Sequence, residues 1–254
     1  MSIALPYIEI DGCPAADAAP AALAVLQSGY GHFTAMQVRD GRVRGLALHL
    51  ERLAGATREL FGRGLDGERV RTLVRHALAS AGMRDASVRV YVYETAVAVT
   101  VRGPQTMAEA PRSLMSVPYQ RPVAHIKHLG GFAQGYYGGA AARAGYDDAL
   151  LTGPGGVVSE GHITNVAFWD GTSVVWPDAP ALRGITMALL EPRLLPSARR
   201  VVTLADLPSY RAAFLMNSQG FAPVRRIDST AFAVEEELMK RVREGYDAVP
   251  RDEI

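Results

Sequence analysis

The spacing of apolar residues along this chain switches between two periods, and this switch constrains the fold more than any other feature. Residues 87–94, SVRVYVYE, alternate strictly, so the three valines share one face of a predicted strand. Residues 46–62 and 68–82 instead repeat their apolar positions with a helical period. Strands and helices fall into two blocks without regular βαβα alternation, which predicts an α+β fold with two domains.

The second block begins with two predicted hairpins. Residues 147–160 turn at Gly-Pro-Gly-Gly, and residues 163–177 turn at Asp-Gly. The later apolar patterns predict three helices and three strands: helices over 132–145, 184–196 and 232–246, and strands over 199–204, 212–218 and 222–228.

A proline-rich region separates the two blocks and is the best linker candidate. Its prolines stand at four positions: Pro104, Pro111, Pro118 and Pro122. We therefore expect a small N-terminal α/β domain at 1–117, a linker at 118–126, and a larger C-terminal domain with a mixed sheet at 127–254.

Composition excludes several classes of protein. The formal net charge is +1, from 27 basic and 26 acidic residues, so no basic excess points to nucleic acid or an anionic membrane. No apolar run approaches the roughly 20 residues that span a bilayer, and the N-terminus lacks a signal-peptide pattern. The single cysteine, Cys13, fits a reducing compartment. We expect a cytoplasmic protein, and no metal site is predicted.

Lys127 is one of only two lysines in the chain, the other being Lys240. Arginine can replace lysine where only positive charge is needed, but a guanidinium keeps its proton and cannot attack a carbonyl. In a partly apolar pocket the pKa of a lysine ammonium falls towards neutrality, which frees an amine able to form a Schiff base. The alternative is an ordinary loop lysine.

Glu160 ends an apolar strand, where a carboxylate is costly unless a cation pairs with it. A protonated pyridine nitrogen would be such a partner. The alternative is a surface hairpin that carries a solvated glutamate.

Three segments carry candidate groups for binding an anion. Ile185 and Thr186 follow Gly184 at the start of a predicted helix, where backbone amides and a hydroxyl can bind an anion. Asn217 and Ser218 join two predicted strands, and Arg52 lies on the first helix. The alternatives are an ordinary helix cap, a plain turn and a solvated arginine.

These motifs occur in an order that resembles the class IV (fold type IV) pyridoxal-phosphate enzymes, which include branched-chain and D-amino acid aminotransferases and aminodeoxychorismate lyase. The resemblance covers most of the chain and implies a two-domain fold of the D-amino acid aminotransferase type. The motifs that carry it are GYGHF (29–33), HLERL (49–53), IKHL (126–129), GYDDALLTGPGGVVSEGHITNVAF (145–168), LRGIT (182–186) and NSQGFAPVRRID (217–228).

The resemblance implies roles in binding pyridoxal 5′-phosphate. Lys127 matches the lysine that holds the cofactor as an internal aldimine and then moves the proton between two carbons. Glu160 matches the acid that keeps the pyridine nitrogen protonated. The other cofactor positions are Arg52, Ile185, Thr186, Asn217 and Ser218 around the phosphate, Leu182 against the ring, and Asn165 in the central motif.

Four residues are candidates for binding the substrate. Tyr30 and Phe33 match positions where the small domain lines the substrate pocket in the family. Arg89 and Tyr91 lie on the polar face of the strand at 87–94, and Arg89 would bind a substrate carboxylate. A solvated strand face is the alternative for these two.

The leading functional hypothesis is an aminotransferase acting on a small amino acid and a 2-oxo acid by a ping-pong mechanism. The second is an aminodeoxychorismate lyase-like enzyme that releases pyruvate. The third is a binding protein that keeps the fold without the cofactor, motivated by three departures from the family pattern, Phe132, Arg183 and Met187. The resemblance also implies a homodimer.

Overall fold

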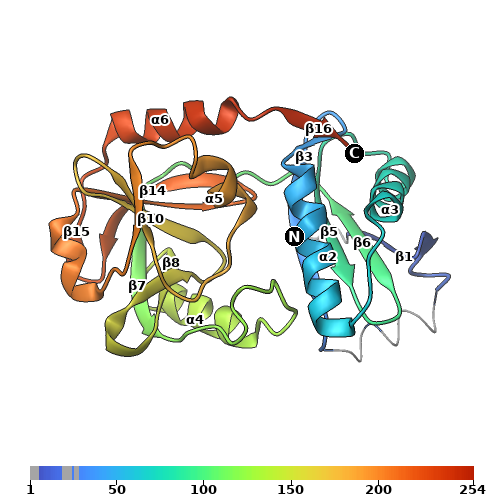
Figure 1. The fold of residues 1–254 in the computed structure, drawn as a ribbon, viewed down its shortest axis with the longest axis horizontal. Coiled ribbons are helices and arrows are strands. Elements are labelled where there is room, and N and C mark those ends of the chain that lie inside the picture. Colours follow the sequence, from blue (N-terminus) through green and yellow to red (C-terminus); the bar gives the residue numbers. More distant parts are fainter. Residues whose placement is uncertain (1–5, 19–24, 26–28) are drawn as a thin grey trace. The chain divides into compact units, whose positions relative to one another are not determined.

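The computed structural model describes residues 6–18, 25 and 29–254, and the chain divides into two compact units. Each unit contains its own sheet and its own helices (Figure 1). The domain boundaries expected from the sequence stay a prediction. The units comprise Met1–Gln105, Ile126–Gly130 and Pro250–Ile254 (unit 1), and Thr106–His125 and Gly131–Val249 (unit 2).

Unit 1 contains an antiparallel sheet of five strands. The strands are β1 (Tyr7–Ile10), β2 (Cys13–Pro14), β3 (His32–Val38), β5 (Ala86–Val92) and β6 (Val97–Arg102), in the order β2-β1-β6-β5-β3. The predicted alternation in β5 is confirmed, since its valines are buried against α2 (Leu46–Phe61) and α3 (Gly67–Ser80). The opposite face of the sheet carries the polar side chains of β5.

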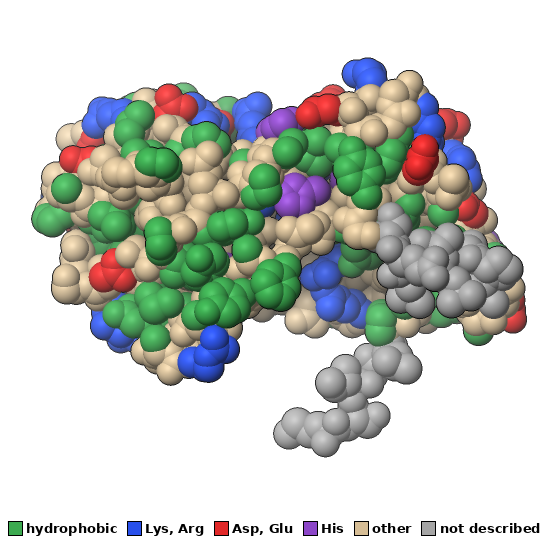
Figure 2. Space-filling view, turned by 90° about the horizontal axis from the view of Figure 1, so that it is seen from below, with side chains coloured by type: hydrophobic (Ala, Val, Ile, Leu, Met, Phe, Trp, Pro, Cys, Tyr) green, Lys and Arg blue, Asp and Glu red, His purple; other side chains and the backbone are tan. Residues whose placement is uncertain are grey.

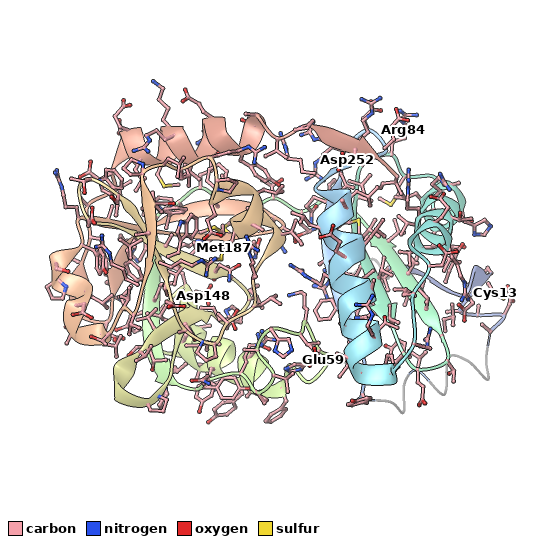
Figure 3. All side chains as sticks on the ribbon, in the orientation of Figure 1. Cys13, Glu59, Arg84, Asp148, Met187 and Asp252 are labelled. Carbon is pink, nitrogen blue, oxygen red and sulfur yellow. The ribbon has the colours of Figure 1, made fainter. Side chains whose placement is uncertain are left out.

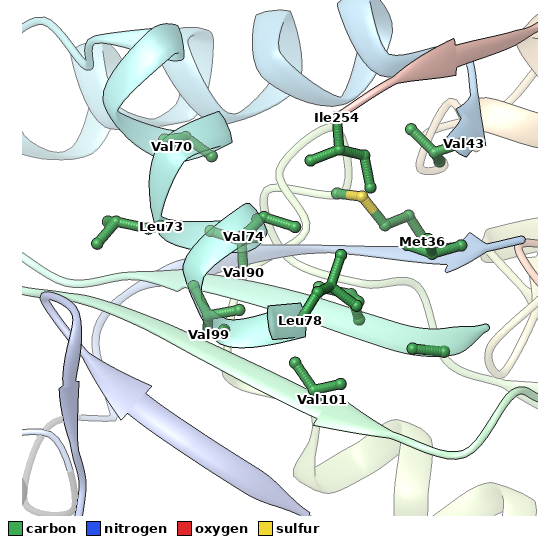
Figure 4. Close-up of a cluster of buried hydrophobic side chains, with 14 of the residues drawn as sticks. Met36, Val43, Val70, Leu73, Val74, Leu78, Val90, Val99, Val101 and Ile254 are labelled. Atoms are coloured by element: carbon green, nitrogen blue, oxygen red, sulfur yellow. The ribbon is translucent and has the colours of Figure 1, made fainter. Parts of the chain in front are cut away.

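The C-terminus of the chain completes the core of unit 1. Strand β16 (Arg251–Glu253) pairs with β4 (Arg42–Arg44), and Ile254 packs in the apolar cluster with Met36 and Val43 (Figure 4). The first backbone N–H of α2, on Leu46, donates to the Asp252 carboxylate at 2.9 Å. An N–H at a helix start lacks a partner within the helix, so β16 caps α2 as well as covering the core.

Unit 2 contains a mixed sheet of nine strands, ordered β12-β11-β10-β13-β14-β7-β8-β9, with β15 paired to β14. The predicted hairpins are confirmed as the antiparallel pairs β8–β9 and β10–β11. The strands are β7 (Arg112–Pro118), β8 (Asp148–Thr152), β9 (Val158–Gly161), β10 (Asn165–Trp169), β11 (Val174–Pro177), β12 (Ser197–Arg200), β13 (Ala212–Asn217), β14 (Gly220–Ile227) and β15 (Thr230–Ala231).

Helices and apolar clusters cover both faces of this sheet. The helices are α4 (Phe132–Arg143), α5 (Ile185–Leu190) and α6 (Glu236–Asp247). In β13, Leu215 belongs to one apolar cluster, whereas Phe214 belongs to a second cluster that includes residues of α5 and α6. Because both faces are buried, strands such as β13 are continuously apolar and do not alternate.

The structure corrects several expected elements. The proline-rich region is not only a connection, because β7 lies within the sheet between β14 and β8. Pro118 is the last residue of β7. The strand expected at 199–204 is β12, which ends at Arg200 and is followed by a 3-10 helix, Leu204–Ser209. The helix expected over 184–196 ends at Leu190.

Three features of the structure bear on the classes of protein that composition excludes: helix length, metal-ligand groups and surface charge. Among the described residues, none of the helices combines the length and apolar character needed to cross a bilayer. Within the same residues, no group of three or more His, Cys, Asp or Glu is arranged to hold a metal ion. On the face drawn in Figure 2, Lys and Arg side chains are interspersed with acidic and apolar ones.

Candidate active site

Lys127 lies on a short segment that pairs with the start of β3 in unit 1. The backbone N–H of Phe33 donates to the Lys127 carbonyl at 2.9 Å, and the N–H of Leu129 donates to the Gly31 carbonyl at 2.9 Å. The Lys127 Nζ atom lies 4.8 Å from the centroid of the Phe33 ring. The backbone of this lysine is therefore held in place by a strand and its side chain lies against an aromatic ring.

Phe33 belongs to a row of side chains on the sheet face opposite the helices. Its ring stacks on Tyr91 with centroids 5.4 Å apart, and the Arg89 guanidinium lies 5.9 Å from the Phe33 centroid. Arg89 Nη1 also donates to the Tyr91 hydroxyl at 3.3 Å. Unit 1 thus brings together four of the predicted site residues: Lys127, Phe33, Arg89 and Tyr91.

Arg52 and Lys127 both lie within electrostatic range of a buried histidine, His49. The Nδ1 atom of His49 is 2.7 Å from the Thr34 hydroxyl. Burial, together with the charges of Arg52 and Lys127, lowers the pKa of His49 to about 3, so this ring is neutral at pH 7. Burial lowers the pKa of Arg52 to about 10, which leaves the guanidinium charged.

His32 is a second buried histidine between β3 and α2. Its Nε2 atom donates to the Thr57 hydroxyl at 3.0 Å, because that hydroxyl donates its own proton to the Leu53 carbonyl at 2.8 Å. Burial and the charge of Arg63 lower the pKa of His32 to about 4. Sequence reasoning missed both buried histidines. The pattern that could have predicted their burial is that His32 and His49 occupy core-facing positions of β3 and α2.

Tyr30, the fourth substrate candidate, lies away from this row. Its side chain is 61% exposed, and its ring meets Phe61 edge-on at a centroid distance of 5.8 Å. The structure places it at the C-terminal end of α2.

Glu160, in unit 2, is buried at the end of β9 and pairs with Arg121. The Arg121 Nη1 atom lies 3.2 Å from Glu160 Oε1 and donates to the Ala124 carbonyl at 2.9 Å. The other carboxylate oxygen accepts the N–H of Leu182 at 3.2 Å. Glu160 is therefore not a solvated residue. Sequence reasoning missed Arg121, although the cost of a buried carboxylate predicts a cationic partner.

Asn165 fixes the loop that carries Leu182. Its Nδ2 donates to the Leu182 carbonyl at 2.7 Å, and its Oδ1 accepts the Gly184 N–H at 3.1 Å. A Cβ atom on Gly184 would lie only 2.0 Å from that Oδ1, so glycine permits this close approach. Both backbone groups of Leu182 are thus held, its N–H by Glu160 and its carbonyl by Asn165.

Thr186 connects the start of α5 to the turn between β13 and β14. Its hydroxyl donates to the Asn217 carbonyl at 2.7 Å, and the Asn217 Oδ1 accepts the Gln219 N–H at 2.8 Å. Ile185 and Ser218 adjoin these two residues in the chain. Unit 2 therefore brings together seven predicted residues: Glu160, Asn165, Leu182, Ile185, Thr186, Asn217 and Ser218.

The three departures from the family pattern lie outside these hydrogen bonds. Met187 is buried in the apolar cluster beneath α5 (Figure 3). Arg183 forms an ion pair with Glu191 at 3.4 Å. Phe132 is 87% exposed at the start of α4.

The model for amino-transferase class IV matches residues 31–227. The chain belongs to the class IV aminotransferase family. Family membership bears out the expected family and, at the level of the family, the expected cofactor, pyridoxal 5′-phosphate. A search of curated proteins found no match.

Solved structures share the fold. The branched-chain amino acid aminotransferase of Escherichia coli matches with a TM-score of 0.80 and 18% identity, over 94% of this chain and 92% of that one. A putative 4-amino-4-deoxychorismate lyase of Legionella pneumophila matches with a TM-score of 0.79 and 18% identity, over 87% of this chain and 92% of that one. A hypothetical aminotransferase of Mycobacterium tuberculosis, in an alpha-ketoglutarate and PMP bound form, matches with a TM-score of 0.77 and 22% identity, over 89% of this chain and 90% of that one. The expected fold type IV architecture is confirmed.

Proposed function

We propose that this protein is a pyridoxal 5′-phosphate-dependent aminotransferase that transfers an amino group between a small amino acid and a 2-oxo acid. The observation that carries the proposal is the position of Lys127 Nζ, 4.8 Å from the Phe33 ring, in one row with Arg89 and Tyr91. A candidate nucleophile and candidate substrate-binding groups thus occur in the same unit. Family membership supports this reaction class.

The side chains present fit pyridoxal 5′-phosphate. This cofactor offers an aldehyde, a phosphate and a ring nitrogen, for which the chain supplies an amine (Lys127), a partly buried guanidinium (Arg52) and a buried carboxylate (Glu160). Glu160 already binds Arg121 and the Leu182 N–H, but a carboxylate can accept about four hydrogen bonds, so it retains capacity for a protonated ring nitrogen. The remaining residues of the proposed set are Asn165, Leu182, Ile185, Thr186, Asn217 and Ser218.

Each of these residues has a defined task in the proposed reaction. When bound, the cofactor supplies an electron sink for the carbanion at the substrate Cα. The Lys127 amine removes the Cα proton as a general base and returns a proton as a general acid. Arg121 holds the Glu160 carboxylate in position through their buried ion pair. Arg89 binds a substrate carboxylate, with Phe33 and Tyr91 packed beside it.

Borohydride reduction of the holoprotein, followed by peptide mapping, tests the lysine assignment. We expect the modified residue to be Lys127, and Lys127→Ala to abolish both the modification and the visible absorbance of the bound cofactor. Lys240→Ala is the matched control and keeps both, because Lys240 lies on α6 outside the proposed set. Modification at Lys240, or at no lysine, refutes the assignment. Loss of all absorbance in the wild type, even with added cofactor, favours the binding-protein alternative.

A pyruvate-releasing lyase is the second candidate function. The similarity to the putative 4-amino-4-deoxychorismate lyase structure favours it. The segments QSGYGHFTAMQVRDG and IKHL also resemble those of aminodeoxychorismate lyases. Single-turnover assays separate the two reactions. A transaminase converts the cofactor to its amine form with the amino substrate alone, whereas a lyase regenerates the aldehyde form and releases pyruvate without an acceptor.

The proposal includes a homodimer in the cytoplasm. The dimer follows from the family expectation, and the location from the single cysteine, Cys13, which is exposed and free. Light scattering of the purified holoprotein tests the dimer, since a monomeric mass at micromolar concentration contradicts it.

A further inference from the structure

The turn between β9 and β10, residues 161–164, lies between two residues of the proposed cofactor set, Glu160 and Asn165. The turn is closed by its own backbone, because the Gly161 N–H donates to the Thr164 carbonyl at 2.8 Å. A Cβ atom on Gly161 would lie 2.0 Å from the Thr164 hydroxyl oxygen, so glycine permits this close approach. The conformation of the turn therefore determines where β9 ends, directly after Glu160.

Asp148, which is labelled in Figure 3, is buried at the start of β8 and binds two side chains of this turn. Its Oδ1 atom pairs with His162 Nδ1, and its Oδ2 atom accepts the Thr164 hydroxyl at 3.3 Å. The same Oδ1 accepts the Ala149 N–H at 2.6 Å. Hydrogen bonds to a carboxylate shielded from water are stronger than those at the surface. One buried carboxylate thus joins the second and fourth residues of the turn to β8.

The position of Glu160 depends mainly on the turn side of the β8–β9 ladder. Glu160 pairs with Leu151, and the register shifts directly after Leu151, so pairing on that side is irregular. On the turn side, the His162 N–H donates to the Ala149 carbonyl at 2.9 Å and extends the pairing. The contact between Asp148 and the His162 ring comes next along the two chains. Glu160 is therefore held chiefly by the bonds of the residues that follow it.

Helix α4 packs against the His162 ring through Gly138. A Cβ atom on Gly138 would lie 2.6 Å from the ring Cδ2 and 2.8 Å from Nε2, so a side chain there would displace the ring. Gln134, also on α4, donates to the His162 carbonyl at 2.6 Å. Because the Asp148 carboxylate can only accept, His162 Nδ1 carries a proton and donates it. The fold thus supplies both the space for this imidazole and the acceptor for its proton.

We propose that Asp148, His162 and Thr164 are positioning residues that hold Glu160 where it binds the ring nitrogen of the cofactor. They act through the turn that follows Glu160 and have no need to touch the cofactor themselves. Charge-assisted N–H···O bonds have a narrow range of lengths, about 2.7–2.9 Å, so a small shift at the end of β9 weakens such a bond. This inference rests on the proposed function and adds residues that the predicted set does not contain.

Two forms of the cofactor test the inference without catalysis. Calorimetry of the apoprotein gives the dissociation constants of pyridoxal 5′-phosphate and of its 1-deaza analogue, in which a C–H group replaces the ring nitrogen. We expect His162→Leu to weaken binding of pyridoxal 5′-phosphate about 10-fold or more, since a hydrogen bond between charged groups contributes a factor of about 10 to 100. Binding of the deaza analogue is expected to change by less than about two-fold, because the analogue offers Glu160 no nitrogen. An equal loss for both compounds, or no loss for either, overturns the proposal.

Further variants assign the effect to hydrogen bonds. His162→Asn keeps an N–H donor near the Nδ1 position and is expected to restore most of the affinity for pyridoxal 5′-phosphate. Thr164→Val removes the second donor to Asp148 and is expected to act in the same direction, less strongly. Thr172→Val is the matched control, because Thr172 also donates to an aspartate, Asp170, at 2.8 Å in the β10–β11 turn, and it changes neither affinity.

Two outcomes with these variants bear on the assignment. A loss in His162→Asn equal to that in His162→Leu overturns the role of the hydrogen bond. If His162→Leu fails to fold, Thr164→Val decides by the same comparison of the two compounds.

The wild-type protein separates failure of this inference from failure of the proposed function. If it binds pyridoxal 5′-phosphate more tightly than the deaza analogue, and His162→Leu does so to the same extent, only the positioning role is wrong. If the wild type binds both compounds equally, the pairing of Glu160 with the ring nitrogen is wrong and the inference falls, while the lysine assignment stands or falls with borohydride reduction. If the wild type binds neither compound, the proposed function fails, and the inference fails with it.

Discussion

The two buried histidines of unit 1 predict that the folded protein loses stability in mild acid. His32 and His49 have folded-state pKa values of about 4 and about 3, below the unfolded value of about 6.5. Below pH 6.5 the unfolded chain therefore binds protons that the folded chain does not. The free energy of unfolding falls as the pH drops from about 6.5, and each contribution stops falling below the folded-state pKa.

The size of the effect follows from these values. At pH 5 each histidine is about 1.5 pH units below its unfolded pKa and still above its folded one, and each unit corresponds to about 1.4 kcal/mol. Each ring therefore lowers the free energy of unfolding by about 2 kcal/mol at pH 5, or about 4 kcal/mol for the pair. That is a large part of the 5–15 kcal/mol typical of a folded domain.

Native-state hydrogen exchange of the apoprotein measures this loss within unit 1. Peptides from β3 and α2 report the opening free energy of the elements that enclose both rings, at pH 7, 6 and 5. His49→Gln is expected to remove about half of the pH dependence whatever it does to stability at pH 7. His125→Gln is the control, because His125 is an exposed residue of unit 2.

Two results would refute this reasoning. One is a wild-type loss of less than about 1 kcal/mol in opening free energy between pH 7 and pH 5, measured for β3 and α2. The other is an equal pH dependence in the wild type and in His49→Gln, which would assign the proton uptake to other groups.

Three further substitutions test the site and the fold. Arg121→Leu leaves the buried Glu160 charge without its partner and is expected to cost about 3–5 kcal/mol in urea unfolding of unit 2. Gly184→Ala places a Cβ against a side-chain oxygen at 2.0 Å and is expected to weaken cofactor binding in an absorbance titration, whereas Gly103→Ala, with open space around it, is not. Asp66→Ala removes the side-chain cap of α3 and is expected to cost about 1 kcal/mol in unit 1.

Local patterns in the sequence were sufficient for most elements. The alternation at 87–94 identified β5 because one face of that strand meets α2 and α3 and the other does not. The turns at 153–156 and 170–171 identified two hairpins because the flanking strands pair with each other. Residue type made Lys127 a candidate, through the contrast between an amine and a guanidinium, and the family resemblance gave it a role that stays a prediction.

Long-range pairing explains what the sequence did not predict. Strand β7 follows Pro111 and ends at Pro118, and it is stabilised by β8 and β14, neither of which a local pattern connects to it. The α2 start is capped by Asp252, some 206 residues away. The segment Ile126–Gly130 belongs to unit 1 through its bonds to the start of β3, although its sequence neighbours belong to unit 2.

Charge balance and burial both differ between two ionic groups of this protein, the Glu160–Arg121 pair and the Arg89–Arg102 pair. In unit 2, Glu160 needs a cation, and the chain supplies Arg121 at 3.2 Å, so this pair is complete before any ligand binds. In unit 1, Arg89 and Arg102 share a cavity without a carboxylate among the described residues. Arg89 and Arg102 are only partly buried, so water screens part of their charge, and the lack of a carboxylate beside them costs less than it would beside a fully buried group such as Glu160.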